Sequence, residues 1–241
     1  MNKPPASFQY SGTELEAVAS AKNYYRWIVE RFGPFFGRRV VEVGAGIGTF
    51  AEFIISSPGV EELLCVEPAE NVFPILAGRF SDDTRIQTVH ANIEELDLAD
   101  AADSFVAVNV LEHVEHDEAF LRTAAKVVVP GGHLLLFVPA HQFLYGSLDA
   151  AFDHYRRYSK AGLSSVVSRA GWEMVSISNV NIAGVLPWLF AGKVLRKTTL
   201  GHRQMQIFDR LVVPIMKRVE SVREPFIGQS LLVIARNPRA Q

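Results

Sequence analysis

Short apolar runs alternate with amphipathic stretches from the first buried strand onward. Five runs rich in β-branched and aliphatic residues predict strands at residues 40–43, 62–66, 85–89, 104–109 and 134–138. Between them, apolar positions at helical spacing predict helices over about 49–56, 70–79 and 116–128. Such alternation is typical of right-handed βαβ units, in which a mainly parallel sheet carries helices on its faces.

The segments on either side of this core follow other patterns. Residues 13–31 predict one amphipathic helix that ends near Gly33 and Pro34, and Pro130–Gly132 predicts a sharp turn before the fifth strand. After residue 138 comes a long polar and aromatic connection, 139–158, of a kind that is usually functional or mobile. A helix over 160–170, a strand over 172–180, a partly apolar helical region over 182–223 and a last strand over 226–235 complete the expected order.

Composition narrows the classes of protein that fit this pattern. With 241 residues, 49% of them hydrophobic, the chain has enough apolar surface for one large domain. The net charge of -2 gives no global reason to expect a nucleic-acid partner, and the single cysteine, Cys65, excludes an internal disulfide. The polar N-terminus predicts no signal peptide, and no apolar run reaches the roughly 18 residues of a spanning helix, so we expect a cytoplasmic protein.

The first strand runs directly into a glycine-rich turn. Gly44, Gly46 and Gly48 follow Glu42 at alternate positions, so a ligand can lie against the backbone and use its free amides. Glu42 interrupts an otherwise apolar strand, and a buried acid requires a cationic, hydroxyl-bearing or other donor partner. Thr49 stands where the dinucleotide fingerprint has its third glycine, which counts against a nicotinamide site.

Polar residues also end the next three strands. Glu67 and Pro68 follow the second strand, where a carboxylate can accept both hydroxyls of a ribose. Asn92 and Ile93 follow the third, where an amide and a backbone N–H can meet an adenine edge. The fourth strand ends in Asn109–His113. Because parallel strands end at one edge of a sheet, all four motifs are expected to meet there.

With these four motifs in this order, the chain resembles the class I S-adenosylmethionine-dependent methyltransferases, closely over 38–138 and more loosely to the end. The resemblance implies S-adenosyl-L-methionine as cofactor and S-adenosyl-L-homocysteine as product. It also implies a Rossmann-like sheet of seven strands, mainly parallel with the last strand antiparallel, and a helical insertion before that strand. The cofactor-binding residues that it implies, with an aromatic cover from the N-terminal helix, are Tyr24, Glu42, Gly44, Ala45, Gly46, Gly48, Glu67, Pro68, Asn92, Ile93, Asn109 and Val110.

The resemblance divides the chain as one methyltransferase domain over 1–241. Residues 1–37 form an N-terminal helical cap and 38–138 the cofactor-binding core. Residues 139–181 supply an acceptor-side loop, helix and strand, 182–223 a helical lid or insertion, and 224–241 the last strand and tail.

The acceptor side of the site is predicted from the residue types that follow the fifth strand. Residues 153–159, Asp-His-Tyr-Arg-Arg-Tyr-Ser, resemble a signature of a bacterial subgroup of these enzymes, and Ser159 is a helix cap there without its usual acidic partner. A hydroxyl acceptor needs a base, whereas an amine or an acidic carbon needs only positioning. The candidate catalytic residues are His113, His141, His154 and Tyr155, and the candidate substrate-binding residues are Arg156, Arg157, Tyr158 and Trp188. The alternative for the tandem arginines is a structural ion-pair cluster.

The segment 182–223 combines apolar and basic residues. From Lys193 to Arg223 there are eight Lys or Arg against two acids, Asp209 and Glu220, a net of +6. One interpretation is a peripheral contact with an anionic membrane or a passage for a lipid-like acceptor. The other is a lid or a homodimer helix whose basic face is solvated.

The sequence thus predicts methyl transfer to O, N or C of a small or medium-sized, partly apolar acceptor of natural-product, lipid-like or quinone-like type. No carboxylate arrangement stands out as a metal site, so the expected mechanism is metal-independent. Two alternatives stay open: an NAD-dependent oxidoreductase on a similar sheet, and a non-catalytic S-adenosylmethionine-binding partner protein.

Overall fold

The strands form one sheet in the order β3-β2-β1-β4-β5-β7-β6 in a computed structural model that describes residues 9–10 and 19–238. β7 is antiparallel to both of its neighbours, β5 and β6, and the remaining pairings are parallel. The predicted fold class is therefore confirmed. The strands are β1 Arg39–Val43, β2 Glu62–Val66, β3 Ile86–Val89, β4 Ala102–Val108, β5 Val128–Pro139, β6 Glu173–Val180 and β7 Ser230–Arg236.

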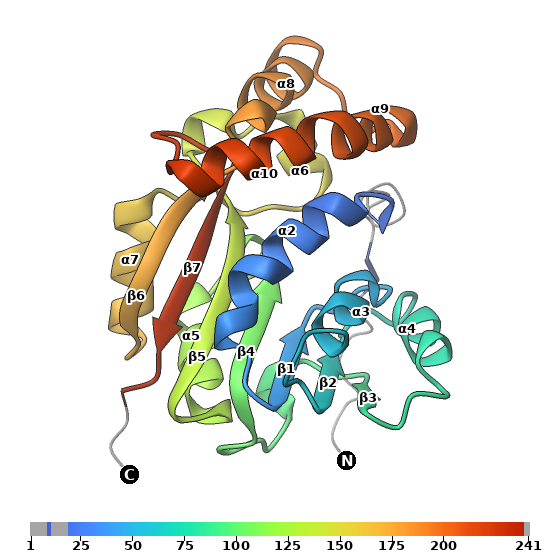
Figure 1. Ribbon diagram of the computed structural model, residues 1–241, viewed down its shortest axis with the longest axis vertical. Coiled ribbons are helices and arrows are strands. Elements are labelled where there is room, and N and C mark those ends of the chain that lie inside the picture. The colour runs from blue at the N-terminus through green and yellow to red at the C-terminus, as the bar shows by residue number, and fades with distance from the viewer. Residues whose placement is uncertain (1–8, 11–18, 239–241) are drawn as a thin grey trace.

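Helices cover both faces of the sheet, as Figure 1 shows. Side chains alternate between the two faces along β5: Leu134 and Leu136 pack into one apolar cluster and Leu135 and Phe137 into the other. On the first face lie α5 Asp117–Val127 and α7 Lys160–Arg169, and on the second lie α2 Lys22–Phe32, α3 Thr49–Ile55 and α4 Phe73–Arg79.

A third group of helices lies across the carboxyl ends of the parallel strands, at the top of Figure 1. It consists of α6 Ser147–Ala151, α8 Val185–Leu189, η6 Phe190–Val194, α9 His202–Ile207, η7 Phe208–Val212 and α10 Val213–Val222, with η6 and η7 wound as π-helices. The short 3-10 turns are η1 Gly33–Phe35, η2 Ile93–Glu95, η3 Leu111–His113, η4 Gln142–Leu144 and η5 Ile182–Gly184. None of the described helices is both long and apolar enough to cross a membrane.

The prediction of one helix over 13–31 is wrong where the structure describes it. Ser20 and Ala21 interrupt the helical path, and α2 begins at Lys22; residues 11–18 lie outside the described part. The Asp209 carboxylate accepts hydrogen bonds from the backbone N–H groups of Asn23 and Tyr24, at 3.1 and 2.8 Å. The free amides at the start of α2 are therefore satisfied by a residue far away in sequence, which periodicity does not reveal.

The region after β4 also differs from prediction. Pro130–Gly132 is not a turn before the strand, because β5 already begins at Val128 and the extra residues form an irregularity opposite Ala102 and Ser104. Residues 139–158 are not structureless, since they hold η4, α6 and a bridge between Ala140 and Tyr158. The helix boundaries elsewhere agree within a few residues.

Candidate functional site

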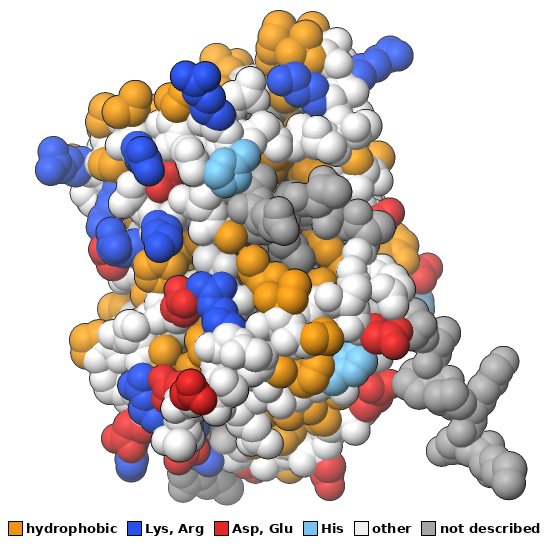
Figure 2. Space-filling view, turned by 90° about the vertical axis from the view of Figure 1, so that its right-hand side faces the viewer, with side chains coloured by type: hydrophobic (Ala, Val, Ile, Leu, Met, Phe, Trp, Pro, Cys, Tyr) orange, Lys and Arg blue, Asp and Glu red, His pale blue; other side chains and the backbone are white. Residues whose placement is uncertain are grey.

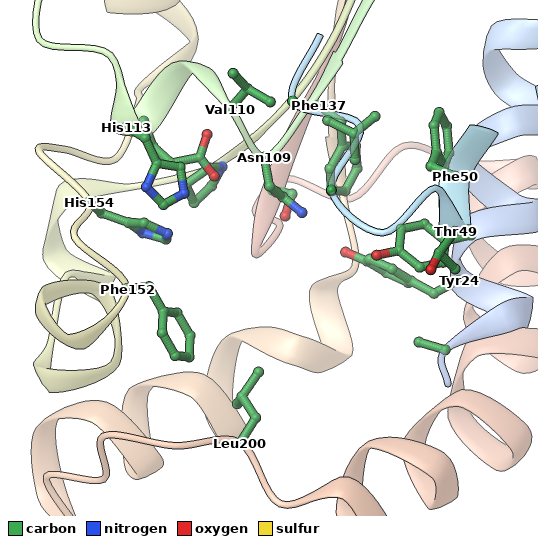
Figure 3. Close-up of a pocket in the computed structure, with 18 of the residues that line it drawn as sticks. Tyr24, Thr49, Phe50, Asn109, Val110, His113, Phe137, Phe152, His154 and Leu200 are labelled. Carbon is green, nitrogen blue, oxygen red and sulfur yellow. The ribbon is translucent and has the colours of Figure 1, made fainter. Parts of the chain in front are cut away.

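One cavity of about 950 Å³ lies between the carboxyl ends of the strands and the helices above them. That volume is at the upper end of the roughly 300–1,000 Å³ of small-molecule sites, so it has room for two ligands. Figure 3 shows His113, His154 and Phe152 on one side and Tyr24, Thr49 and Phe50 on the other, with Asn109 between them.

The glycine turn forms one wall of this cavity. Gly44 and Gly46 have φ of 68° and 56°, a left-handed conformation that favours glycine. A Cβ on Gly44 would lie 2.5 Å from Cγ2 of Val110, so a side chain at this position would collide with another residue of the cavity wall. Gly48 does not line the cavity; its Cβ would meet the Phe80 ring at 2.4 Å, which makes its role helix packing and corrects the prediction of a ligand contact.

Two buried carboxylates, Glu42 and Glu67, stand beside the turn and line the cavity. The Glu67 carboxylate accepts hydrogen bonds from the N–H of Gly46 at 2.7 Å and of Ala69 at 2.9 Å, which fixes its orientation. Burial raises the pKa of Glu42 to about 8, and the neighbouring Glu67 adds to the rise. A cationic group placed between these acids would remove that penalty, as the sequence predicts for an ammonium.

The third and fourth strand ends also reach the cavity. Asn92 lines its rim, but the side-chain N–H₂ of Asn92 donates to Glu95 Oε1 at 3.2 Å in a helix cap, so an adenine contact would compete with that bond. Ile93 is buried behind it. Asn109 has φ of 53°, the left-handed conformation that Asn tolerates best among residues with a Cβ. Ala45, Pro68 and Val110 complete the predicted cofactor wall.

Aromatic and aliphatic side chains line the rest of the cavity. The Tyr24 ring packs edge-on against Phe137, with centroids 5.8 Å apart, and burial raises the pKa of Tyr24 to about 12. Tyr24 therefore stays a neutral phenol. Opposite it, Trp188 lies beside Phe152, and Phe190 and Phe208 project from the two π-helical turns, a geometry that often occurs at functional sites.

Three ionisable residues form a cluster on the remaining wall: Glu112, His113 and His154. The two imidazole centroids are 4.7 Å apart and their rings are nearly perpendicular. Burial lowers the pKa of His113 to about 4, and the His154 charge acts in the same direction. His113 is therefore neutral at physiological pH and presents a lone pair.

Four other predicted site residues do not line the cavity. Tyr155 is 55% exposed, Arg156 pairs with Asp117 at 3.0 Å, and the buried Tyr158 donates to the Leu111 carbonyl. His141 is also outside. Of the signature Asp153–Ser159, only His154 and Arg157 line the cavity.

Arg157 reaches the cavity wall but serves the structure. Its Nε donates to Asp149 Oδ1 at 2.6 Å, its Nη1 donates to the Ala140 carbonyl, and its guanidinium stacks 4.7 Å from the Trp188 ring centre. Because these groups occupy Nε and Nη1, the ion-pair interpretation of the tandem arginines describes the contacts better than substrate binding does.

The sequence interpretation missed several lining residues. Glu112 was within a predicted motif but received no role, and Asp209 received none beyond its charge. Phe50 and Phe137 lie in a predicted helix and strand and received no site role, because an apolar residue facing a cavity has the same periodicity as one facing the interior. Thr49 and Phe152 also line the cavity and received no site role.

The comparisons with known proteins agree with this geometry. The family model described as "Methyltransferase domain" matches residues 18–177. A probable S-adenosylmethionine-dependent methyltransferase of Mycobacterium tuberculosis is 25% identical over 206 residues, which is 82% of this chain and 70% of that protein.

Two other relatives match over shorter regions. A probable histone-arginine methyltransferase CARM1 of Oryza sativa is 29% identical over 126 residues, 50% of this chain. The mitochondrial ubiquinone biosynthesis O-methyltransferase of Mus musculus is 29% identical over 113 residues, 43% of this chain. The chain spans only 24% and 29% of the lengths of these two relatives, and their named acceptors differ.

Among solved structures, phosphoethanolamine N-methyltransferase 2 of Haemonchus contortus, in complex with S-adenosyl-L-methionine, has a TM-score of 0.65. The match covers 99% of this chain and 62% of that one at 16% identity. At this identity the likeness concerns the fold.

Proposed function

The chain belongs to the methyltransferase-domain family, and we propose that it transfers the methyl group of S-adenosyl-L-methionine to a small or medium-sized, partly apolar organic acceptor. The observation that carries this proposal is the continuity of one cavity from the glycine turn and Glu67 to His113 and His154. A cofactor held at one end would present its reactive group toward ionisable side chains at the other.

The residues at the cofactor end fit S-adenosyl-L-methionine. Gly44 and Gly46 line the cavity without side chains, so a ligand can approach their backbone closely. The Glu67 carboxylate, fixed by two N–H donors, has lone pairs left for ribose hydroxyls. Glu42, next to Glu67, favours a positively charged amino group.

When bound, S-adenosyl-L-methionine supplies an electrophilic methyl group on a sulfonium, and S-adenosyl-L-homocysteine is the leaving group. The walls of the cavity would exclude water and position the O, N or C atom of the acceptor near that methyl group. His113 and His154 are placed to accept the proton that a hydroxyl acceptor loses.

The acceptor end favours a partly apolar molecule. Apolar side chains from α6, α8 and the turns above them line it: Leu148, Phe152, Trp188, Phe190, Leu195 and Leu200. This lining suits a natural-product, lipid-like or quinone-like acceptor with one polar atom for the histidines.

Calorimetric titration with S-adenosyl-L-methionine tests the cofactor assignment. We expect Glu67→Gln to weaken binding by roughly tenfold to a hundredfold, because hydrogen bonds to a charged group contribute about 1.5–3 kcal/mol. Glu70→Gln is the matched control, since Glu70 is an exposed carboxylate nearby that does not line the cavity. Equal affinity in both variants, with unchanged circular dichroism, would refute the ribose assignment.

Two rival functions give different outcomes. Tight NAD binding without affinity for S-adenosyl-L-methionine would favour an oxidoreductase. Binding of S-adenosyl-L-methionine without formation of S-adenosyl-L-homocysteine, across hydroxyl, amine and carbon acceptors, would favour a non-catalytic binding protein.

We also propose that the helices above the cavity rest on an anionic membrane surface, so that the protein is cytoplasmic and peripheral. Exposed apolar residues follow one stripe along α9–α10, at Ile207, Leu211, Ile215, Val219 and Val222. Both acids of this region are buried as helix caps, Asp209 on α2 and Glu220 on η5. The exposed side chains of the region therefore carry a more positive charge than the net of +6 counted along its sequence. Figure 2 shows basic and apolar side chains together on the upper part of the molecule.

Vesicle sedimentation tests the surface. We expect binding to phosphatidylglycerol vesicles, none to phosphatidylcholine, and several-fold weaker binding of Leu211→Ser, whose side chain is 64% exposed. Ala150→Ser, an exposed position on α6 outside the stripe, is the control. If the protein forms dimers and binds neither kind of vesicle, this face would instead be assigned to a homodimer interface.

A further inference from the structure

The Glu112 carboxylate lies fully buried at the wall of the cavity, on the short turn η3. Apart from a contact with its own backbone N–H, neither carboxylate oxygen has a hydrogen-bond partner among the described residues. A buried carboxylate without donors is costly unless a proton or a cation accompanies it.

Arg157, the cation that could pair with Glu112, already has other partners. The Arg157 guanidinium is near enough to influence Glu112 electrostatically, but its Nε and Nη1 donate to Asp149 and to the Ala140 carbonyl. Glu112 therefore lacks a direct ionic partner within the described part of the chain.

Two imidazoles stand beside this carboxylate. One potential ligand atom of each of Glu112, His113 and His154 lies within 4.8 Å of the other two. Bonds of about 2.0–2.2 Å to a common tetrahedral ion place ligand atoms roughly 3.4 Å apart, so binding would draw the three side chains closer together. Figure 3 shows His113 and His154 next to each other at the same side of the cavity.

Each imidazole is also oriented by an acceptor behind it. His154 Nδ1 is 3.0 Å from Asp149 Oδ1, and His113 makes a hydrogen bond to the backbone of Asp153. Such bonds fix the tautomer and leave one nitrogen of each ring free for a ligand, as behind most metal-binding histidines.

We propose that Glu112, His113 and His154 bind one divalent first-row cation, such as Zn²⁺, whose open positions face the cavity. Two imidazoles and one carboxylate suit Zn²⁺ or Fe²⁺ better than Mg²⁺, which prefers oxygen ligands. The ion would hold a polar atom of the acceptor and favour its deprotonated form, so that with a metal bound the ion, and not His113 or His154, would promote loss of the acceptor's proton. This proposal departs from the sequence expectation of a metal-independent mechanism. It stands on these side chains alone and does not rest on the proposed methyl transfer.

Titration of the metal-stripped full chain with ZnCl₂, followed by a competing chromophoric chelator, tests the site. We expect one equivalent to bind, with affinity at least tenfold above that for Mg²⁺. Co²⁺ in place of Zn²⁺ should give the visible absorption of a low-symmetry site with nitrogen ligands.

The variants Glu112→Gln and His154→Asn should each lower Zn²⁺ affinity at least tenfold. His202→Asn is the matched control, because His202 is an exposed imidazole on α9 that does not line the cavity. Thermal unfolding checks that each variant folds, and His113→Asn replaces any that does not. Failure of the wild type to bind one equivalent, or equal affinity of folded ligand variants and control, would overturn the site.

The titration is done without S-adenosyl-L-methionine, so it is independent of the proposed function. Stoichiometric Zn²⁺ binding with no S-adenosyl-L-methionine binding would support the metal site and refute only the methyltransferase assignment.

Discussion

The cofactor end and the acceptor end of the cavity are built by different means. At the cofactor end, residues within a few positions of each strand terminus supply backbone amides and carboxylates, as at Gly44–Gly46 and Glu67. At the acceptor end, Asp149 and His154 of one segment meet Glu112 and Trp188 of two others only after folding. The difference teaches that a binding site can be local in sequence at one end and depend largely on long-range contacts at the other.

The strongest test of this contrast removes the residue that joins the acceptor segments. Asp149 is fully buried and accepts hydrogen bonds from Arg157, His154, Trp188 and the Gly146 N–H. We expect Asp149→Ala to lower the free energy of unfolding by about 3–5 kcal/mol, because Arg157 is left buried and unpaired.

Urea unfolding followed by fluorescence measures this loss. The control is Asp83→Ala, which removes a solvent-screened pair with Arg85 and should cost much less than Asp149→Ala. Similar losses in the two variants would show that the acceptor end does not depend on one long-range anchor.

A second test concerns the locally built end. Gly44→Ala and Gly59→Ala both place a Cβ on a residue of positive φ, 68° and 86° respectively. The backbone strain of this conformation should lower the free energy of unfolding by about 1–2 kcal/mol in each variant. Only at Gly44 does the Cβ meet a neighbour, Val110 Cγ2 at 2.5 Å, whereas nothing lies within 4 Å at Gly59.

We therefore expect Gly44→Ala to lose more stability than Gly59→Ala, because Val110 must shift, and a loss of S-adenosyl-L-methionine affinity of more than about tenfold for Gly44→Ala alone. Calorimetry on both variants decides. Retained affinity in Gly44→Ala would mean that the cofactor does not approach this backbone.

A third test uses pH. Burial, followed by the charge of Glu67, raises the pKa of Glu42 to about 8 in the folded chain. The folded state then binds this proton more tightly than the unfolded state, whose carboxyl titrates near about 4.3. The contribution of Glu42 to the free energy of unfolding is therefore full below about pH 4 and is lost as the pH rises through about 8.

Between about pH 6 and pH 8 the free energy of unfolding should fall by roughly 1–3 kcal/mol relative to that of Glu42→Gln. Parallel denaturant curves at the two pH values give this difference. Glu70→Gln should follow the wild type, and identical slopes in all three proteins would contradict the assignment.

The smallest expected effect concerns the signature loop. Arg156 pairs with Asp117 at a partly exposed site and does not line the cavity. Arg156→Ala should change kcat/KM less than about threefold and cost no more than about 1 kcal/mol. Turnover with any identified acceptor checks this, and Arg157→Ala, which strands the buried Asp149 carboxylate, should be much more destabilising. A large loss of kcat/KM in Arg156→Ala would return that arginine to the acceptor site.

Much of the fold followed from the sequence because strands and helices have different periodicities. The succession of strands along the chain and the Ser159 cap, whose Oγ accepts from the Gly162 N–H, were predicted from the residues, and the antiparallel β7 was implied by the family resemblance. The spatial order of the strands in the sheet was not predicted. The start of α2 was not, since its amides are capped by Asp209, 186 residues from Asn23. Which side of the loop Tyr155 or Arg156 faces also had no periodic signal, because irregular backbone follows no fixed repeat.

The sequence by itself determined the cofactor end: a glycine turn, an acid after β2 and polar residues after β3 and β4 converge wherever parallel strands end together. Only the tertiary structure decided the acceptor end. Whether Glu112 has a donor, whether His154 meets His113, and whether Arg157 is free or paired depend on contacts between segments, and those contacts are set by packing. The regular backbone of a strand sets the direction of the residue that follows it, whereas the position of a loop side chain depends on its tertiary contacts.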